Sequence, residues 1–277
     1  MRLTTKIVIG FILSIFILAL GFIIGFSLTG RVDYGWNSEK LSISQENIIS
    51  IDVEAYKTIW MDSEPNMCNE YNVYPEGTIS IKPVTVPNEE NKLFLPKELT
   101  QFIDMVSSND TLIIRFKIKD LYDKYAENIS RNKHLSSRIG GFNLSVHTNT
   151  VDIISNLSGI KTDVRNIETD KIKINTSGDI YIDSCQADII EPYIRGNRKK
   201  FELKNSQVKE LNTDLDCMAN NWKVENCDIE VENLTGNGTH NIVLPKSKAK
   251  VLTWIPKNKN AALNVTLYGD TARIVFP

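Results

Sequence analysis

The chain has 277 residues, a formal net charge of −2 and 42% hydrophobic residues. This length allows one large domain or two small ones. The nearly balanced charge argues against nucleic acid as a partner, because nucleic-acid-binding domains carry an excess of Lys and Arg on one face. The basic run at residues 195–200 is typical of a solvated loop.

An uncharged, apolar run extends from Ile7 to Leu28. As a helix it would be roughly 33 Å long, enough to cross a hydrocarbon core of ~30 Å. The run is longer than the apolar region of a signal peptide, and no A-x-A cleavage pattern follows it. We therefore predict a retained transmembrane anchor over residues 7–29 rather than a cleaved signal peptide.

The charges around this run predict its orientation. Arg2 and Lys6 precede it, whereas Arg31 behind it is offset by acidic residues. The positive-inside rule then places residues 1–6 in the cytoplasm and the rest of the chain outside, as in a single-pass protein of the cell membrane.

Gly21 and Gly25 form a G-x-x-x-G pair within the predicted helix. Such a pair allows two helices to approach closely, although glycine is also common in membrane helices for other reasons. We prefer the second explanation, with weak helix dimerisation as the alternative.

The segment after the anchor begins with a polar stretch. Residues 30–47 contain Gly and Asn and are expected to form a juxtamembrane connector. Alternating apolar and polar residues over 48–54 predict a half-buried strand, which residues 57–61 would continue. Pro and Gly over residues 63–77 predict a loop before the next alternating run, residues 78–82.

Two helices and a further strand are expected before residue 140. Apolar residues recur at helical spacing after Pro96 and predict a helix over 96–106. Residues 111–118 alternate as a strand does, and residues 120–130 favour a short helix. Residues 48–139 are therefore expected to form a strand-rich segment with short helices.

From about residue 140 the chain consists of short alternating runs separated by Asn, Asp, Ser and Gly. This spacing is typical of an all-β protein. The runs are residues 142–146, 151–154, 171–174, 179–182, 240–245, 251–255, 262–267 and 272–277.

A repeat of 21 residues lies within this region, with copies that begin at Ile180, Phe201 and Trp222. The pattern is apolar-x-apolar-x-polar-small-x-apolar, and Trp222 is expected to lie in the core. The small residues of the three copies are Cys185, Ser206 and Cys227.

A β-solenoid explains this repeat most simply. Equivalent residues of successive coils would stack about 4.8 Å apart, and the apolar columns would fill the interior. The alternative is chance similarity among the strands of a sandwich. We predict a mainly β fold with solenoid repeats over residues 140–277, in which the last strand caps the open end.

The repeat also constrains the cysteines. Cys185 and Cys227 would lie in one column two coils apart, so their separation would be about 9–10 Å, beyond the ~7 Å limit for a disulfide. We predict that both are buried and unpaired. The spacing of Cys68 and Cys217 does not indicate a zinc or redox motif.

An anchor followed by short repeated strands, such as residues 177–184 and 205–208, resembles the bacterial adhesin domains of the DUF4097 and GIN-domain (DUF2807) type. The resemblance covers about residues 140–275. It implies an extracytoplasmic, right-handed β-solenoid without an established activity, and it supplies no catalytic residues.

No catalytic or cofactor-binding motif is present in the sequence, and the three histidines, His134, His147 and His240, are expected to be surface or packed residues. Carboxylates on a solenoid could act on a glycosidic bond or bind calcium, although acidic residues also mark solvated turns. The carboxylates in question are Asp179, Asp183, Asp188, Asp214 and Asp216.

Exposed aromatic residues are a further candidate for binding, because they stack on sugar rings. The candidates are Tyr34, Trp36, Trp60 and Trp254. A concentration of aromatic residues on one exposed face would favour a binding role.

These observations predict a membrane-anchored, extracytoplasmic β-solenoid that acts as a non-catalytic, adhesin-like or scaffold protein of the cell envelope. No catalytic residue, cofactor or metal site is predicted. The expected partners are the membrane, through the N-terminal helix, and a protein or a glycan outside the cytoplasm. The alternative is a cell-envelope enzyme that acts on glycans with surface carboxylates.

Overall fold

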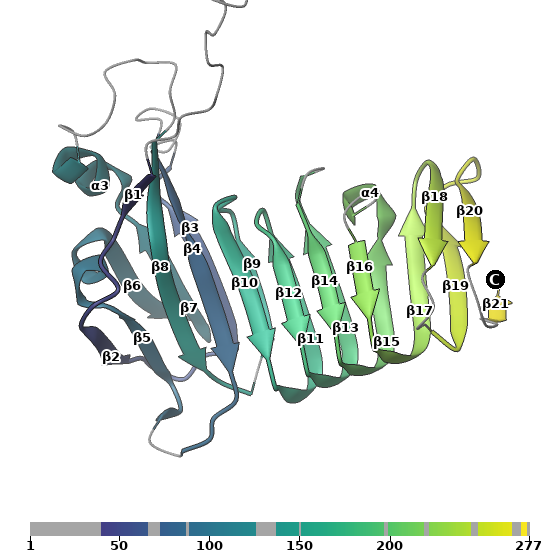
Figure 1. Ribbon diagram of the computed structural model, residues 1–277, viewed down its shortest axis with the longest axis horizontal. Coiled ribbons are helices and arrows are strands. Elements are labelled where there is room, and N and C mark those ends of the chain that lie inside the picture. The colour runs from purple at the N-terminus through teal and green to yellow at the C-terminus, as the bar shows by residue number, and fades with distance from the viewer. Residues whose placement is uncertain are drawn as a thin grey trace, which may run out of the picture.

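The computed structural model describes residues 40–65, 73–86, 89–125, 137–149, 151–196, 199–218, 222–244, 249–267 and 273–275. Two long sheets, made mostly of parallel strands, lie face to face along the molecule (Figure 1). This mainly β architecture with stacked parallel sheets agrees with the fold class predicted from the sequence.

Within the described residues, the first sheet, sheet A, is built from β1 (Lys40–Ser42), β2 (Ile48–Asp52), β4 (Val73–Lys82), β5 (Lys92–Pro96), β8 (Ser137–His147), β10 (Ile160–Arg165), β12 (Ile180–Asp183), β14 (Phe201–Lys204) and β16 (Trp222–Glu225). The opposite sheet, sheet B, is built from β3 (Thr58–Ser63), β6 (Ile103–Ser108), β7 (Thr111–Phe116), β9 (Val151–Ser155), β11 (Glu168–Thr176), β13 (Gln186–Ile194), β15 (Gln207–Asp214), β17 (Asp228–Gly236), β19 (Val251–Pro256) and β21 (Arg273–Val275). A small parallel pair is formed by β18 (Thr239–Leu244) and β20 (Ala262–Leu267). The helical segments are the 3₁₀ helix η2 (Lys97–Phe102) and the α-helices α3 (Ile118–Tyr125) and α4 (Leu215–Met218).

Successive coils stack in register. In sheet A, Ile180 lies opposite Phe201, and Phe201 lies opposite Trp222. In sheet B the same 21-residue step relates β13, β15 and β17. The predicted repeat is confirmed. Trp222 differs from expectation because it lies on the edge strand β16 and is half-buried rather than fully buried.

A residue with positive φ follows each of the strands β10, β12, β14 and β16. These residues are Asn166, Ser184, Asn205 and Asn226, with φ between 48° and 57°. Asparagine adopts this left-handed conformation more readily than most residues, because its short polar side chain hydrogen-bonds locally. The Asn205 amide donates to Asp183 Oδ1 at 2.9 Å, and the Asn226 amide donates to Asn205 Oδ1 at 3.3 Å. These side-chain hydrogen bonds join the turns after β12, β14 and β16.

After Ser184, Asn205 and Asn226, the next residue is one of the three small residues of the repeat, Cys185, Ser206 and Cys227. Cys185 and Cys227 are buried and form no disulfide, as predicted, and Ser206 between them accepts a hydrogen bond from the Cys185 backbone N–H at 3.1 Å. Burial raises the pKa of the Cys185 thiol. Cys217 also forms no disulfide among the described residues, and Cys68 lies outside them.

Both sheets continue across residue 140, the expected start of the solenoid. In sheet A, β4 lies between β8 and β10, and in sheet B, β3 lies between β7 and β9, all as parallel pairs. Antiparallel pairing occurs at the N-terminal end of the sheets, through β2, β5 and β6. Residues 48–139 therefore contribute strands to the same two sheets as the repeats.

The loop expected over residues 63–77 is wrong in part, because β4 begins at Val73. Pro75 and Gly77 lie within this strand, next to a bulge between Glu76 and Gly77, where a sheet tolerates proline. A Cβ on Gly77 would lie 2.5 Å from the Phe142 ring. This glycine therefore provides space in the core rather than a turn.

The helix expected over residues 96–106 is also wrong in part. Residues 97–102 form η2, but the chain is extended at Ile103, with φ −130° and ψ 143°. Ile103 then pairs with Phe116 in the β6–β7 hairpin. The apolar spacing that favoured one helix serves two elements, because Leu99 and Phe102 are buried from η2 and Ile103 is buried from β6.

Two further predictions near the start of the described chain are wrong in part. Residues 40–42, expected in the connector over 30–47, form β1 beside β8. Residues 57–61 do not continue β2, because the chain crosses to sheet B and begins β3 at Thr58. The helix expected over 120–130 is confirmed for residues 120–125, because α3 spans Ile118–Tyr125, and residues 126–130 lie outside the described residues.

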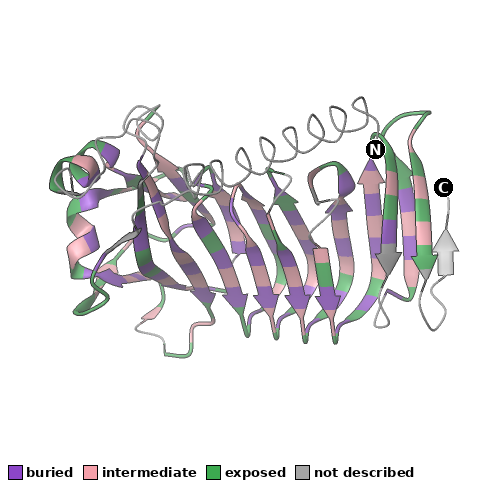
Figure 2. Cartoon of the chain, turned by 45° about the horizontal axis from the view of Figure 1, so that its top comes forward, coloured by how far each residue is buried: buried purple, intermediate pink, exposed green. Residues whose placement is uncertain are grey.

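The core lies between the two sheets. Inward and outward residues alternate along the strands, as the burial colours show (Figure 2). The buried side chains form one long cluster and a smaller one at the C-terminal end, around Leu234, Leu252 and Trp254. This packing makes sheet B a supported platform for the side chains on its outer face.

The predicted anchor over residues 7–29, with Gly21 and Gly25, lies outside the described residues, as do residues 1–6. No helix in the described part of the chain combines the length and the apolar character that crossing a bilayer requires.

Candidate functional site

The aspartates considered for catalysis are spread over both sheets. Asp179 precedes β12 in sheet A and Asp183 is its last residue, whereas Asp188 lies in β13 of sheet B and pairs with Lys209 at 2.6 Å. The Asn205 amide hydrogen bond lowers the pKa of Asp183, outweighing the effect of burial. This carboxylate is therefore held ionised, which does not suit a general acid.

Lys257 brings Asp214 and Asp216 together. Its Nζ lies 2.6 Å from Asp214 Oδ2 and 3.0 Å from Asp216 Oδ2. Burial alone would raise the pKa of Asp216, but the Asn237 backbone N–H, Lys257 and His240 together lower it. The cluster is an ion-paired junction that joins the end of β15 and the start of α4 to the residue after β19.

Two of the histidines are packed, as expected. His147 Nδ1 lies 2.8 Å from Glu89 Oε2, and the His240 ring lies edge-on to Trp254. His134 lies outside the described residues. Within the residues described, no group of three or more His, Cys, Asp or Glu side chains is arranged to hold a metal ion.

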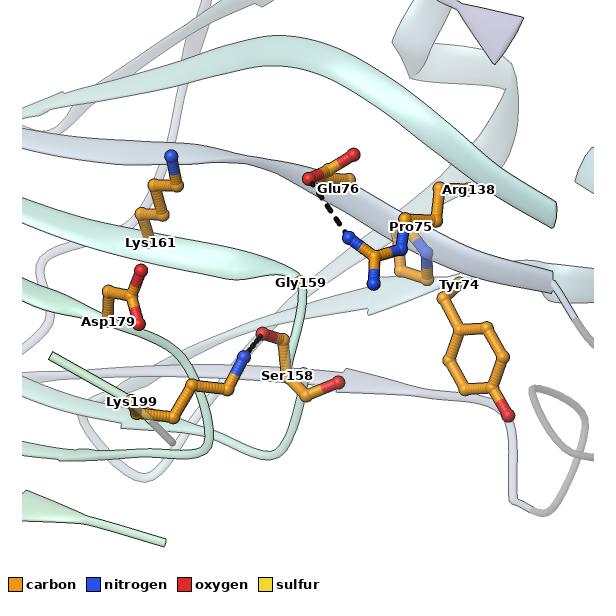
Figure 3. A pocket seen from close by; sticks show the side chains of 9 residues that line it. All are labelled: Tyr74, Pro75, Glu76, Arg138, Ser158, Gly159, Lys161, Asp179 and Lys199. Carbon is orange, nitrogen blue, oxygen red and sulfur yellow. Dashed lines mark hydrogen bonds and ion pairs between the residues drawn. The ribbon is translucent and has the colours of Figure 1, made fainter. Parts of the chain in front are cut away.

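A polar pocket of about 330 Å³ opens beside β4, β8 and β10 (Figure 3). The Arg138 guanidinium lies 3.8 Å from Glu76 Oε1, and Lys199 Nζ donates to the Ser158 carbonyl at 2.6 Å. Lys161, Asp179 and Tyr74 also line the pocket. Its basic and acidic side chains largely offset one another, so it is a polar hollow rather than a concentrated anion site.

One line of outward-facing residues crosses the outer face of sheet B. Strand pairing aligns one residue from each strand between β6 and β19. The β13–β15 pairing, in which Ile190 lies opposite Leu211, places Tyr193 beside Asp214. We call this line the outer row, and its members in spatial order are Val106, Ile113, Trp60, Ile154, Asn175, Tyr193, Asp214, Thr235 and Ile255.

The outer row concentrates the exposed large apolar side chains. Among the described residues these are Ile48, Trp60, Val86, Val106, Tyr193 and Ile255, and four of the six belong to the row. Trp60 is 39% exposed, Tyr193 40%, Ile255 43% and Val106 53%. Exposed apolar side chains that gather in one place mark interaction surfaces, whereas single ones are ordinary.

The C-terminal half of the outer row lines a groove of about 540 Å³ that runs from β11 to β19. Tyr193 and Ile255 contribute apolar surface, and the Asn233 amide donates to Asn212 Oδ1 at 2.9 Å beside them. The neighbouring Cys217 side chain raises the pKa of the Tyr193 hydroxyl. The groove therefore combines an exposed aromatic ring with the polar amides of Asn212 and Asn233.

The aromatic residues considered as binding candidates from the sequence differ in their exposure. Trp60 is exposed, as a binding role requires, whereas Trp254 is buried at 5% exposure and belongs to the core. Tyr34 and Trp36 lie outside the described residues. Tyr193 was not predicted from the sequence, because no local motif marks it. Strand pairing alone places this residue beside the other exposed side chains of the outer row.

Comparisons with known proteins give structural likeness alone. No family model matches the sequence, and no curated protein matches it. The structure is similar to three solved bacterial proteins, each named "putative adhesin". The first, from Parabacteroides merdae, is 10% identical, with 86% of this chain and 98% of that chain covered and a TM-score of 0.37.

The second, from Bacteroides fragilis, is 12% identical, with 86% and 100% covered and a TM-score of 0.45. The third, from Parabacteroides distasonis, is 14% identical, with 86% and 97% covered and a TM-score of 0.40.

Proposed function

We propose that the protein is a membrane-anchored, extracytoplasmic β-solenoid that acts as a non-catalytic, adhesin-like or scaffold protein of the cell envelope. Residues 7–29 would anchor it, with residues 1–6 in the cytoplasm, and the solenoid would present a binding surface outside. The observation that supports a binding role is the outer row, which carries exposed apolar side chains across a continuous sheet.

The physical basis of this proposal is the combination of exposure and rigidity. Side chains on a hydrogen-bonded sheet over a packed core lose little conformational freedom when a partner binds. Polar residues border the outer row, as they border the apolar centre of protein interfaces. A surface of this kind is suited to binding rather than to bond cleavage.

The alternative, a glycan-active enzyme, requires one carboxylic acid that stays protonated near neutral pH and a second carboxylate nearby. The pKa values of Asp183 and Asp216 are lowered instead. Asp214 and Asp216, which do lie together, are both ion-paired with Lys257, which favours their ionised forms. These observations favour the binding role.

The binding role is tested with the full chain in detergent-solubilised membranes. Affinity-tagged wild-type protein should retain envelope material, and the double variant Trp60→Ala/Tyr193→Ala should retain much less. Tyr181→Ala is the matched control, because Tyr181 lies in the same coil on sheet A. Equal retention by the wild type and the double variant would show that the outer row is not the binding surface.

The anchor is tested separately by fractionation. Full-length protein should stay with the membrane pellet after washing at high salt and alkaline pH, because a transmembrane helix is not released by screening charges. Release into the supernatant would overturn the membrane-anchored part of the proposal and leave the binding role standing.

A further inference from the structure

We infer that the outer row binds a neutral polysaccharide chain laid across the coils, with sugar rings stacked on Tyr193 and Trp60. This inference rests on the proposed function and names the class of ligand that the surface takes. It follows from the direction of the row, the groups beside it and the charges around it.

The direction of the row suits a linear polymer. The row runs perpendicular to the strands, from β6 at one end to β19 at the other. Neighbouring strands lie about 4.8 Å apart, so the row is roughly 38 Å long. A chain of similar units laid along it would meet one outward side chain at each coil.

The groups along the row match the two kinds of surface on a sugar ring. The C–H face of a pyranose packs against aromatic and aliphatic side chains, which Tyr193 and Ile255 offer in the groove. The hydroxyl groups at its rim need hydrogen-bond partners, which the Asn212 NH2 and the Asn233 side-chain carbonyl offer two residues along the same strands. The Asn233 NH2 itself donates to Glu210 and Asn212.

The charges of the groove, whose lining includes Lys173, Glu191, Glu210 and Asp214, argue against an anionic ligand. Lys173 lies 3.8 Å from Asp152, and Glu191 accepts an ion pair from Lys171 at 2.8 Å. Asp214 is paired with Lys257, as described above. The cations at the groove are therefore already paired, so an anionic polysaccharide, a nucleic acid or an anionic lipid surface gains little attraction there.

The strand pairing argues against an extended peptide as the ligand. A peptide strand binds a sheet by adding to an open edge, where backbone N–H and C=O groups are free. The outer row instead crosses the face of sheet B, where the strands β3 to β17 have neighbours on both sides. Side chains alone are available to a ligand on this face.

The test is calorimetric titration of the full-length protein, in a detergent without a sugar headgroup. The probes are cellohexaose and mannohexaose as neutral chains, their disaccharides for length dependence, and polygalacturonate as an anionic chain. We expect at least one neutral hexasaccharide to bind, more tightly than its disaccharide. Tyr193→Ala should weaken that binding about tenfold, the loss of roughly 1.4 kcal/mol of stacking, and Tyr181→Ala should not change it.

Three results would overturn the inference: no binding of either neutral hexasaccharide, tighter binding of polygalacturonate, or equal affinity of Tyr193→Ala and wild type. The membrane pull-down separates this failure from that of the proposed function. If a protein partner is retained through Trp60 and Tyr193 while the glycans do not bind, the ligand class is wrong and the binding role stands. If substitutions in the outer row change neither the pull-down nor the titration, both the proposed binding role and the proposed ligand class are wrong.

Discussion

At the scale of single residues, the corner of each coil depends on a left-handed turn and on the side chain that supports it. Asn205 has φ 48°, donates to Asp183 and accepts from Asn226. An asparagine in this position therefore does two things, since it adopts the backbone conformation and joins the coils on either side.

Replacing Asn205 by Ala should lower the free energy of unfolding by about 1–2 kcal/mol. The new side chain is strained at positive φ, and the hydrogen bonds to both neighbouring coils are lost. Asn205→Gly keeps the backbone conformation and loses the hydrogen bonds alone, so it should cost less. Urea unfolding followed by circular dichroism measures both, and an unchanged midpoint for Asn205→Ala would contradict this explanation of the turn.

Acid should destabilise the protein in part through Asp183. The pKa of Asp183 is lowered in the folded state by the Asn205 amide, so the unfolded chain takes up its proton first as the pH falls. The stability that the ionised carboxylate contributes is fully present above the ordinary aspartate pKa of about 3.9 and is lost as the pH falls through the lowered value.

Asp183→Asn should therefore flatten the dependence of unfolding free energy on pH as the pH falls below the ordinary aspartate pKa, where the unfolded chain is protonated at this position before the folded one. Urea unfolding at a series of pH values measures this slope. A variant slope equal to that of the wild type would show that Asp183 does not carry the effect.

At the scale of elements, the sequence predicted strands well wherever burial alternates cleanly. The columns through Ile180, Phe201 and Trp222 follow from their sequence spacing, and the pairing of β12, β14 and β16 matches them. The prediction failed at β4 and at η2–β6, where proline and glycine lie within a strand and where apolar spacing is shared by two elements. Long-range contacts, such as Gly77 against Phe142, decide both cases, and local sequence does not contain them.

Close stacking of the coils makes several glycine positions sensitive, and the Gly178 position is the most crowded among the glycines described. A Cβ on Gly178 would overlap the Ile160 carbonyl of the neighbouring coil, whereas a Cβ on Gly238 would meet no atom within 4 Å. Gly178→Ala should therefore cost at least about 2 kcal/mol, because backbone must move to admit the methyl group. Thermal unfolding compares it with Gly238→Ala, and equal melting temperatures would contradict the stacking described here.

At the scale of the whole molecule, each coil packs mainly against its neighbours, so stability should be close to a sum over coils. Deleting residues 185–205 removes one 21-residue step and joins Ser184 to Ser206, which occupies the position of Cys185. The shortened protein should fold cooperatively, with a β-type circular dichroism spectrum and reduced stability.

The matched control for this deletion is out of register by one residue. Deleting residues 186–205 removes 20 residues and turns the following side chains of sheet B to the wrong face. This variant should fail to fold, whereas the 21-residue deletion should succeed. Equal behaviour of the two deletions would contradict a repeat of stacked coils.

The candidate binding surface could be predicted in part. Trp60 was a candidate from the sequence because of its chemistry, but nothing local links it to Tyr193 or Ile255. The outer row arises from strand pairing. The number of residues between one member of the row and the next differs from one strand pair to another. A surface of this kind is a property of register, so it becomes visible only in three dimensions.

The most direct test of the account compares exposed apolar residues on and off the outer row in one pull-down from solubilised membranes. Val106→Ala, Trp60→Ala, Tyr193→Ala and Ile255→Ala change the row, and Ile48→Ala and Val86→Ala change residues of similar exposure elsewhere. The account predicts reduced retention of envelope material for the row variants and unchanged retention for the other two. Equal loss in both groups, or no loss in either, would contradict the outer row as the functional surface.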